Sequence, residues 1–191
     1  MTEKTTQRSA AKAAARQRIL DSASRRLRGE GLKGAGINPV MADAGLTRGT
    51  FYAHFKDKDT LAREAFRHAI DTDQSAWLDG EDASWSARVA RLSNSYLSKA
   101  HRDAPEQGCA IAALASELTD APESFREHYG DVVLATFQRI AEENPERMDD
   151  AIAILAMLTG GINLARNVPD EQISERVLTV CRKALETLAQ T

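Results

Sequence analysis

Apolar residues recur every three or four positions along most of the chain, and alternation with a period of two is nearly absent. Within residues 10–28, one helical face carries Ala15, Ile19, Ala23 and Leu27. Gly29 and Gly31 are expected to end this helix, and the polar residues 1–9 are expected to form a mobile arm. The pattern predicts an all-α fold of about nine helices.

Glycine, proline and polar clusters divide the rest of the chain into helical segments. Two short helices are expected, one from Asn38 as N-cap and Pro39 as first helical residue to Gly45, the other from Thr47 to Phe55. Longer helices are expected at about residues 58–78, 84–100, 109–118, 123–143, 149–166 and 170–189.

The two short helices have the spacing of a helix-turn-helix, joined at residues 45–47. Gly45 supplies the backbone freedom that the tight turn needs. Five apolar residues are expected to pack between the helices: Val40, Met41, Ala44, Phe51 and Phe55. The second helix, residues 47–55, is then the expected recognition helix, because its small residues suit a DNA major groove.

Residues 16–66 resemble the DNA-binding domain of the tetracycline-repressor (TetR) family of bacterial regulators. The resemblance rests on Ile19-Leu20-Asp21-Ser22-Ala23, Val40-Met41-Ala42-Asp43-Ala44-Gly45-Leu46-Thr47, Gly49-Thr50-Phe51-Tyr52-Ala53-His54-Phe55 and Lys56-Asp57-Lys58-Asp59-Thr60-Leu61. The sequence departs from the family at Asn38, where a threonine is usual, although asparagine also caps helices. The resemblance implies a DNA-binding domain at residues 1–56 and a helical ligand-binding and dimerisation domain at residues 57–191.

Chemistry and resemblance together single out eight DNA-contacting candidates. Arg48 has a planar donor fork that fits guanine O6 and N7, so it is the first candidate for base readout. The others are Asn38, Thr47, His54 and Lys58 for phosphates, Gly49 for close approach, and Thr50 and Tyr52 for phosphates or a thymine methyl. Packing remains an alternative for Tyr52 and His54, and a solvated tail remains an alternative to DNA contacts from Lys4, Arg8 and Lys12.

Charge is divided unevenly between the two parts of the chain. Residues 1–70 hold 14 Lys and Arg against 7 Asp and Glu, whereas residues 71–191 hold 11 against 21. A basic head suggests an anionic partner such as double-stranded DNA, although a solvated basic helix would have the same composition. The longest apolar run, residues 151–158, is too short for a bilayer and the N-terminus is polar, so a cytoplasmic protein without a membrane partner is expected.

The segment around residues 96–117 is similar to a subgroup of TetR-type regulators. It contains Tyr96-Leu97-Ser98, His101-Arg102-Asp103, Gly108-Cys109 and Ala113-Leu114-Ala115-Ser116-Glu117. The resemblance implies a pocket for a small-molecule inducer of unknown identity. Its aromatic candidates are Phe66, Trp77, Trp85, Tyr96, Phe125 and Tyr129, with ordinary core packing as the alternative.

Cys109 follows a glycine at an expected helix start, where backbone donors favour a thiolate. It is therefore a candidate redox sensor, or alternatively a small buried residue. Two cysteines, without a zinc-type Cys/His spacing, predict neither a disulfide framework nor a metal site, and no motif calls for a cofactor.

The last two expected helices carry more apolar surface than one core needs, which predicts a partner chain. The expected interface residues are Ile152, Leu155, Leu158, Ile173, Val177, Val180 and Ala184. The resemblance implies that these helices form a four-helix bundle across a two-fold axis. Gly160 and Gly161 would allow a close helix approach or, alternatively, a kink.

Three functions compete. The first is a ligand- or redox-responsive transcription repressor that binds palindromic operator DNA as a homodimer. The second is an enzyme that uses Cys109 with His101 or His128 as a base, although no orienting third group or carboxylate pair is found. The third is a helical interaction protein whose basic head binds a membrane or an acidic partner, which leaves residues 45–61 unexplained.

Overall fold

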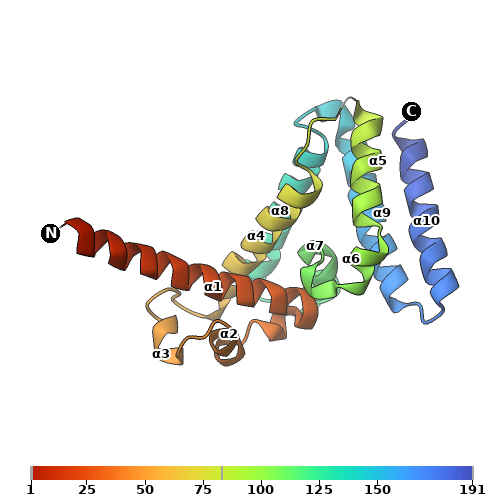
Figure 1. Ribbon diagram of the computed structural model, residues 1–191. Helices are drawn as coiled ribbons and strands as arrows, with labels where there is room; N and C mark the ends of the chain where they lie inside the picture. The colour runs from red at the N-terminus through yellow and green to blue at the C-terminus, as the bar shows by residue number, and fades with distance from the viewer. Residues whose placement is uncertain (1, 83, 191) are drawn as a thin grey trace.

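The computed structural model describes residues 2–82 and 84–190, and every regular element in these ranges is a helix (Figure 1). The predicted all-α class is therefore confirmed. A head is formed by α1 (Thr2–Gly34), α2 (Ile37–Asp43) and α3 (Arg48–Phe51). The body contains α4 (Lys58–Trp77), α5 (Trp85–Tyr96), α6 (Lys99–Asp103), α7 (Ala110–Leu114), α8 (Glu123–Ile140), α9 (Met148–Asn167) and α10 (Glu171–Leu188). Short 3-10 turns lie at Pro105–Gln107, Leu118–Asp120 and Pro145–Arg147.

Helix α1 is longer than predicted at both ends. The expected mobile arm is wrong for residues 2–9, which continue the helix, because nothing in this alanine-rich segment breaks it. Residue 1 lies outside the described ranges. Near the other end, Gly31 leaves helical geometry with φ 68°. The Glu117 carboxylate fills the space that a Cβ would need there and accepts the Leu32 amide at 2.8 Å. The glycine thus kinks the helix where the head meets the body.

The short helices begin and end elsewhere than predicted. Helix α2 is capped by Gly36, which precedes Ile37, so Asn38 is an exposed first-turn residue and not the N-cap. Helix α3 ends at Phe51, although the Phe55 amide still bonds the Phe51 carbonyl at 3.0 Å. The predicted recognition segment is therefore one helical turn followed by further tight turns.

Three predicted body helices are shorter than expected because side chains and turns interrupt them. The expected helix at 84–100 is two helices, since the Ser98 hydroxyl accepts the His101 amide at 3.2 Å and starts α6. The expected helix at 109–118 ends at Leu114. Helix α8 stops at Ile140, before Glu142 and Glu143 adopt positive φ. The long α9 and α10 agree with prediction, and Asp170 caps α10 as expected.

Helix α9 is the apolar centre of the body. The segment Pro145–Asn167 is long and apolar enough to cross a membrane by length and composition. In the fold, however, Ile154, Leu158 and Ile162 are buried between α8 and α10. Its hydrophobicity is therefore that of a core helix, and it does not indicate a membrane span.

Candidate nucleic-acid interface and ligand cavity

The turn between α2 and α3 has the geometry of a helix-turn-helix. Gly45 has φ 64°, and the Leu46 amide bonds the Met41 carbonyl at 2.9 Å. The five residues predicted to pack between these helices, Val40, Met41, Ala44, Phe51 and Phe55, are all at most 6% exposed. The Phe51 and Phe55 rings stack at 5.8 Å. This packing fixes the angle at which α3 is presented.

The DNA-contacting candidates lie at the surface of the head. Six are exposed, and Thr50 and His54 are partly buried: Asn38, Thr47, Arg48, Gly49, Thr50, Tyr52, His54 and Lys58. Tyr52 has 62% of its surface exposed, so most of this side chain is not packed against the head. Arg48 forms no ion pair with any described residue. Its guanidinium is therefore available to an external acceptor.

Basic residues of α1 lie beside the end of this segment. The Arg16 guanidinium lies over the Phe55 ring, 5.1 Å from its centroid. The pKa of His54 is lowered by partial burial and then by the charges of Lys12 and Arg16. The His54 Nδ1 atom is buried and has no hydrogen-bond partner among the described residues. His54 therefore combines a packed ring with a polar atom left unsatisfied.

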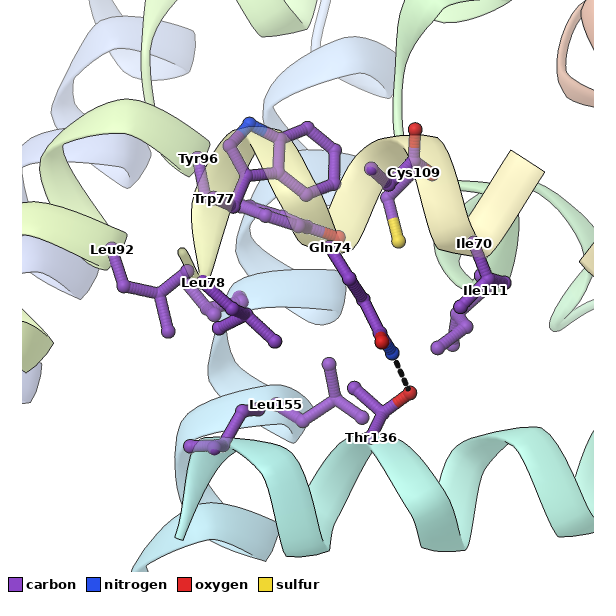
Figure 2. A pocket seen from close by; sticks show the side chains of 13 residues that line it. Ile70, Gln74, Trp77, Leu78, Leu92, Tyr96, Cys109, Ile111, Thr136 and Leu155 are labelled. Atoms are coloured by element: carbon purple, nitrogen blue, oxygen red, sulfur yellow. Dashed lines mark hydrogen bonds between the residues drawn. The ribbon is translucent and has the colours of Figure 1, made fainter. Parts of the chain in front are cut away.

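A small cavity of about 30 Å³ lies inside the body between α4, α5, α7, α8 and α9 (Figure 2). A cavity of this size has room for about two water molecules. Of the predicted pocket residues, Trp77, Tyr96 and Cys109 line it. Phe66, Trp85, Phe125 and Tyr129 do not. They pack elsewhere, Trp85 under the Arg147 guanidinium and Tyr129 against Phe66.

Three polar residues of the cavity, Asp73, Gln74 and Thr136, were not predicted. Figure 2 shows the Gln74 side chain reaching from α4 to Thr136 on α8, where it donates a 2.9 Å hydrogen bond. The Tyr96 hydroxyl is buried, and the Cys109 thiol, a weak hydrogen-bonding group, is the neighbour that interacts with it among the described residues. Asp73 also lines the cavity. The sequence does hold a signal for it, because Asp73 interrupts the apolar stripe Phe66, Ala69, Ile70 and Trp77.

Asp73 joins the cavity to the head. Its Oδ1 accepts from Arg28 of α1 at 2.7 Å, and its Oδ2 accepts from the Ala110 amide of α7 at 3.3 Å. The side chains of Arg28 and Asp73 are each at most 7% exposed. Burial raises the pKa of Asp73 to about 6, and the charge of Arg28 opposes that rise. Asp73 therefore links α1, α4 and α7 through its two carboxylate oxygens.

Cys109 does not have the predicted thiolate character. It is the N-cap residue of α7, but it is 4% exposed, and burial followed by the charge of Asp73 raises the pKa of its thiol. His101 cannot serve as its base, since His101 Nε2 already accepts the Cys109 amide at 3.0 Å while Nδ1 donates to the Tyr96 carbonyl. Burial lowers the pKa of His101 to about 4, so this ring is neutral.

The predicted interface residues divide into two groups. Leu155 and Leu158 are buried and line the cavity, so they do not lie on an outer face. On the outside, α9 and α10 expose Ile152 (43%), Leu164 (60%), Ile173 (46%) and Val180 (56%), with Val177 and Ala184 partly buried beside them. Leu164 was not predicted.

The two glycines of α9 have different surroundings. Gly161 faces α10, where an added Cβ would lie 3.0 Å from the Cys181 Sγ, whereas an added Cβ at the exposed Gly160 would meet nothing. Gly161 therefore permits close packing within the protomer, and the alternative of a kink does not hold, since neither glycine leaves helical geometry as Gly31 does in α1.

The sequence of the head matches a known family of DNA-binding domains. The sequence model of the family described as "Bacterial regulatory proteins, tetR family" matches residues 19–65. The match shows a TetR-type DNA-binding domain in the head of this chain. The matched residues run from the buried part of α1 to the first turns of α4, so they contain the whole helix-turn-helix. A comparison with curated proteins gives no match.

Solved structures of TetR-family proteins are similar in fold to nearly the whole chain. A TetR transcriptional regulator from Chloroflexus aurantiacus is 23% identical, with a TM-score of 0.74 over 95% of this chain and 97% of its own. A putative TetR-family regulator from Rhodococcus sp. is 19% identical, with a TM-score of 0.75 over 93% and 99%. E. coli NemR in its reduced form is 17% identical, with a TM-score of 0.73 over 91% and 96%. The likeness extends the TetR fold to the body.

Proposed function

We propose that this protein is a TetR-family regulator, a cytoplasmic transcription repressor that binds palindromic operator DNA as a homodimer and is released by a small-molecule ligand. Residues 1–56 would bind DNA, and residues 57–191 would bind the ligand and the partner copy. The observation that carries the proposal is the exposed face of the helix-turn-helix, where Arg48 and Tyr52 project from a turn whose other side is packed rigidly. A TetR-type domain with unpaired donors on that face is suited to reading a major groove.

The outer face of α9 and α10 supports dimerisation. Four large apolar side chains are between 43% and 60% exposed there: Ile152, Leu164, Ile173 and Val180. The exposed Gly160 lies on α9, as do Ile152 and Leu164, and leaves room for the backbone of another helix to approach. A second copy placed on this face by a two-fold axis would bury these residues in a self-complementary interface.

The cavity supports a ligand-responsive function. Its walls are mainly apolar, and the buried Tyr96 hydroxyl has only a weak partner among the described residues, the Cys109 thiol. A small uncharged ligand with one hydrogen-bonding group would satisfy it. The cavity is small, so such a ligand would have to widen it, and the Asp73–Arg28 pair would carry the displacement to α1.

The test begins with DNA selected from a random-sequence library by the purified protein. We expect a palindrome with half-sites about one helical turn apart or a multiple of it. Binding should weaken steeply with salt, because phosphate contacts release counterions. Selection of no preferred sequence, or of an isolated half-site bound by a monomer, would overturn the proposal.

The enzyme alternative has no support in the geometry, because the His101 lone pair is occupied by a backbone amide. His128 packs against Phe66 of α4, 6.1 Å between ring centroids, and does not line the cavity. A redox response through Cys109 is also disfavoured by the buried thiol with its raised pKa. Ligand binding is therefore the form of regulation that we propose.

A further inference from the structure

The N-terminal part of α1 projects beyond α2 and α3, on the side of the head away from α9 and α10 (Figure 1). Residues 7–14 are all exposed, and the apolar residues among them are alanines. The core-facing stripe of this helix begins only at Ile19. The projection is therefore not held by a hydrophobic face, and an isolated helix of this length is only marginally stable in water.

One side of the projection is basic. Arg8, Lys12 and Arg16 follow one another at intervals of four residues, and residues 7–18 contain no acidic residue. We call these three residues the basic stripe. It extends about 12 Å along the helix, at 1.5 Å per residue. Arg16 pairs with Glu64, whereas Arg8 and Lys12 form no ion pair with any described residue.

The basic stripe starts beside the recognition segment. The Arg16 guanidinium lies over the ring of Phe55, and the charges of Lys12 and Arg16 act on His54. From there the stripe runs outward, away from the body. A duplex that seats α3 in its major groove would continue past the head in that direction if the partner copy lies against α9 and α10.

We propose that the basic stripe binds backbone phosphates of the operator outside the bases that α3 reads. Each protomer would then cover more of the duplex than its helix-turn-helix alone. The proposal rests on the proposed function, since it needs the head to dock on DNA. DNA fits better than a membrane surface, because helices that lie in membranes carry large apolar residues opposite their basic face, and here that face has only alanine and glutamine.

The experiment uses two duplexes with the same selected palindrome. One ends at the outer edge of the half-sites, and the other continues for about one helical turn on each side. The full-length protein should bind the longer duplex more tightly, by about fivefold for each added phosphate contact at physiological salt. The slope of log K against log salt should also steepen by about 0.9 per contact.

The Arg8→Gln/Lys12→Gln variant should lose this gain and keep its affinity for the short duplex. Lys12→Arg, which keeps the charge, should retain the gain. Arg126→Gln is the matched control, because Arg126 is an exposed arginine of α8 that forms no ion pair with any described residue. This variant should bind both duplexes as wild type does. It shows whether loss of a positive charge elsewhere on the surface also reduces the gain on the longer duplex.

The outcomes separate the two proposals. An equal gain for wild type and the double variant would overturn the role of the basic stripe while the repressor proposal stands. Absence of specific binding to any palindrome would overturn both. Hydroxyl-radical footprinting of the longer duplex should show protected sugars beyond the half-site with wild type and none there with the double variant.

Discussion

The head and the body of this protein use polar side chains in opposite ways. In the head, the residues with binding chemistry face solvent, and the packed side of α2 and α3 is apolar. In the body, the polar groups of interest, Asp73, Gln74 and Tyr96, are inside a small cavity. The head therefore presents a preformed surface, whereas the body stores polar groups in a core that a ligand must open. The difference indicates that DNA contacts can be altered without loss of fold, and cavity contacts mostly cannot.

Breaking the dimer should have the largest effect. Val180→Glu places a charge on the exposed apolar face of α10, where a partner would have to bury it. We expect a folded monomer that binds palindromic DNA about 100-fold more weakly or worse, because two linked heads bind as one unit. Analytical ultracentrifugation measures the oligomeric state, and titration of labelled operator measures the affinity for DNA. Glu186→Gln on the same helix is a control, and a dimeric Val180→Glu protein with normal affinity would contradict the predicted interface.

Removing the link between cavity and head comes next. Asp73→Ala leaves the Arg28 guanidinium buried and unpaired, so we expect unfolding to become easier by about 3–5 kcal/mol. Replacing both residues, as in Arg28→Met/Asp73→Leu, should recover much of that loss. The recovered protein should bind operator but respond less to ligand. Urea unfolding checks the first part, and a double variant as unstable as the single one would argue against a paired-charge cause.

Changes to the exposed face should alter binding but not stability. Arg48→Ala should lose about 1–3 kcal/mol of discrimination between operator and random DNA. Lys58→Ala should weaken both similarly and flatten the salt dependence by about one phosphate. Competition titrations with unlabelled DNA measure the ratio of the affinity for operator to the affinity for random DNA. Equal losses on both DNAs for Arg48→Ala would remove its assigned role in base readout.

The pH dependence of stability should be small because two buried groups offset one another. His101 has a folded pKa of about 4, so its unfolded form binds more protons below about pH 6.5, and stability falls as the pH falls from 6.5 to 4. Asp73 has a folded pKa of about 6, so its folded form binds more protons between about pH 3.8 and 6, and stability rises as the pH falls.

Asp73→Asn should therefore unmask the loss due to His101. Thermal unfolding between pH 4 and 6.5 should show a steeper decline for this variant than for wild type. Parallel curves for the two proteins would show that Asp73 does not hold a proton in the folded state at acid pH.

Cys109→Ser should have the smallest effect on regulation. Because burial raises the pKa of the thiol, we expect slow labelling of Cys109 by a neutral thiol reagent in the folded protein. Operator binding after hypochlorite treatment should be the same for wild type and the serine variant. Rapid labelling at neutral pH, together with a response lost in Cys109→Ser, would restore the redox hypothesis.

Local patterns in the sequence were sufficient for much of the molecule. The helix class, the helix-turn-helix and its five packed residues follow from spacings of three and four and from Gly45. Which residues face out on such short helices is fixed by the same spacing. Asn38 shows the limit of this reasoning, since it is a good capping residue but lies two positions after the actual cap, Gly36.

Only the tertiary structure decided the character of the body. The sequence position of Cys109 predicts a reactive thiol, but its burial raises the pKa of that thiol. Leu155 and Leu158 belong to the core and not to the outer face. Asp73 meets Arg28 across 45 positions of sequence. Periodicity says that a helix has an apolar face but not which helix covers it, because burial and pKa depend on contacts between segments far apart in the chain. The surface chemistry of the head was therefore present in the sequence, and the cavity of the body was not.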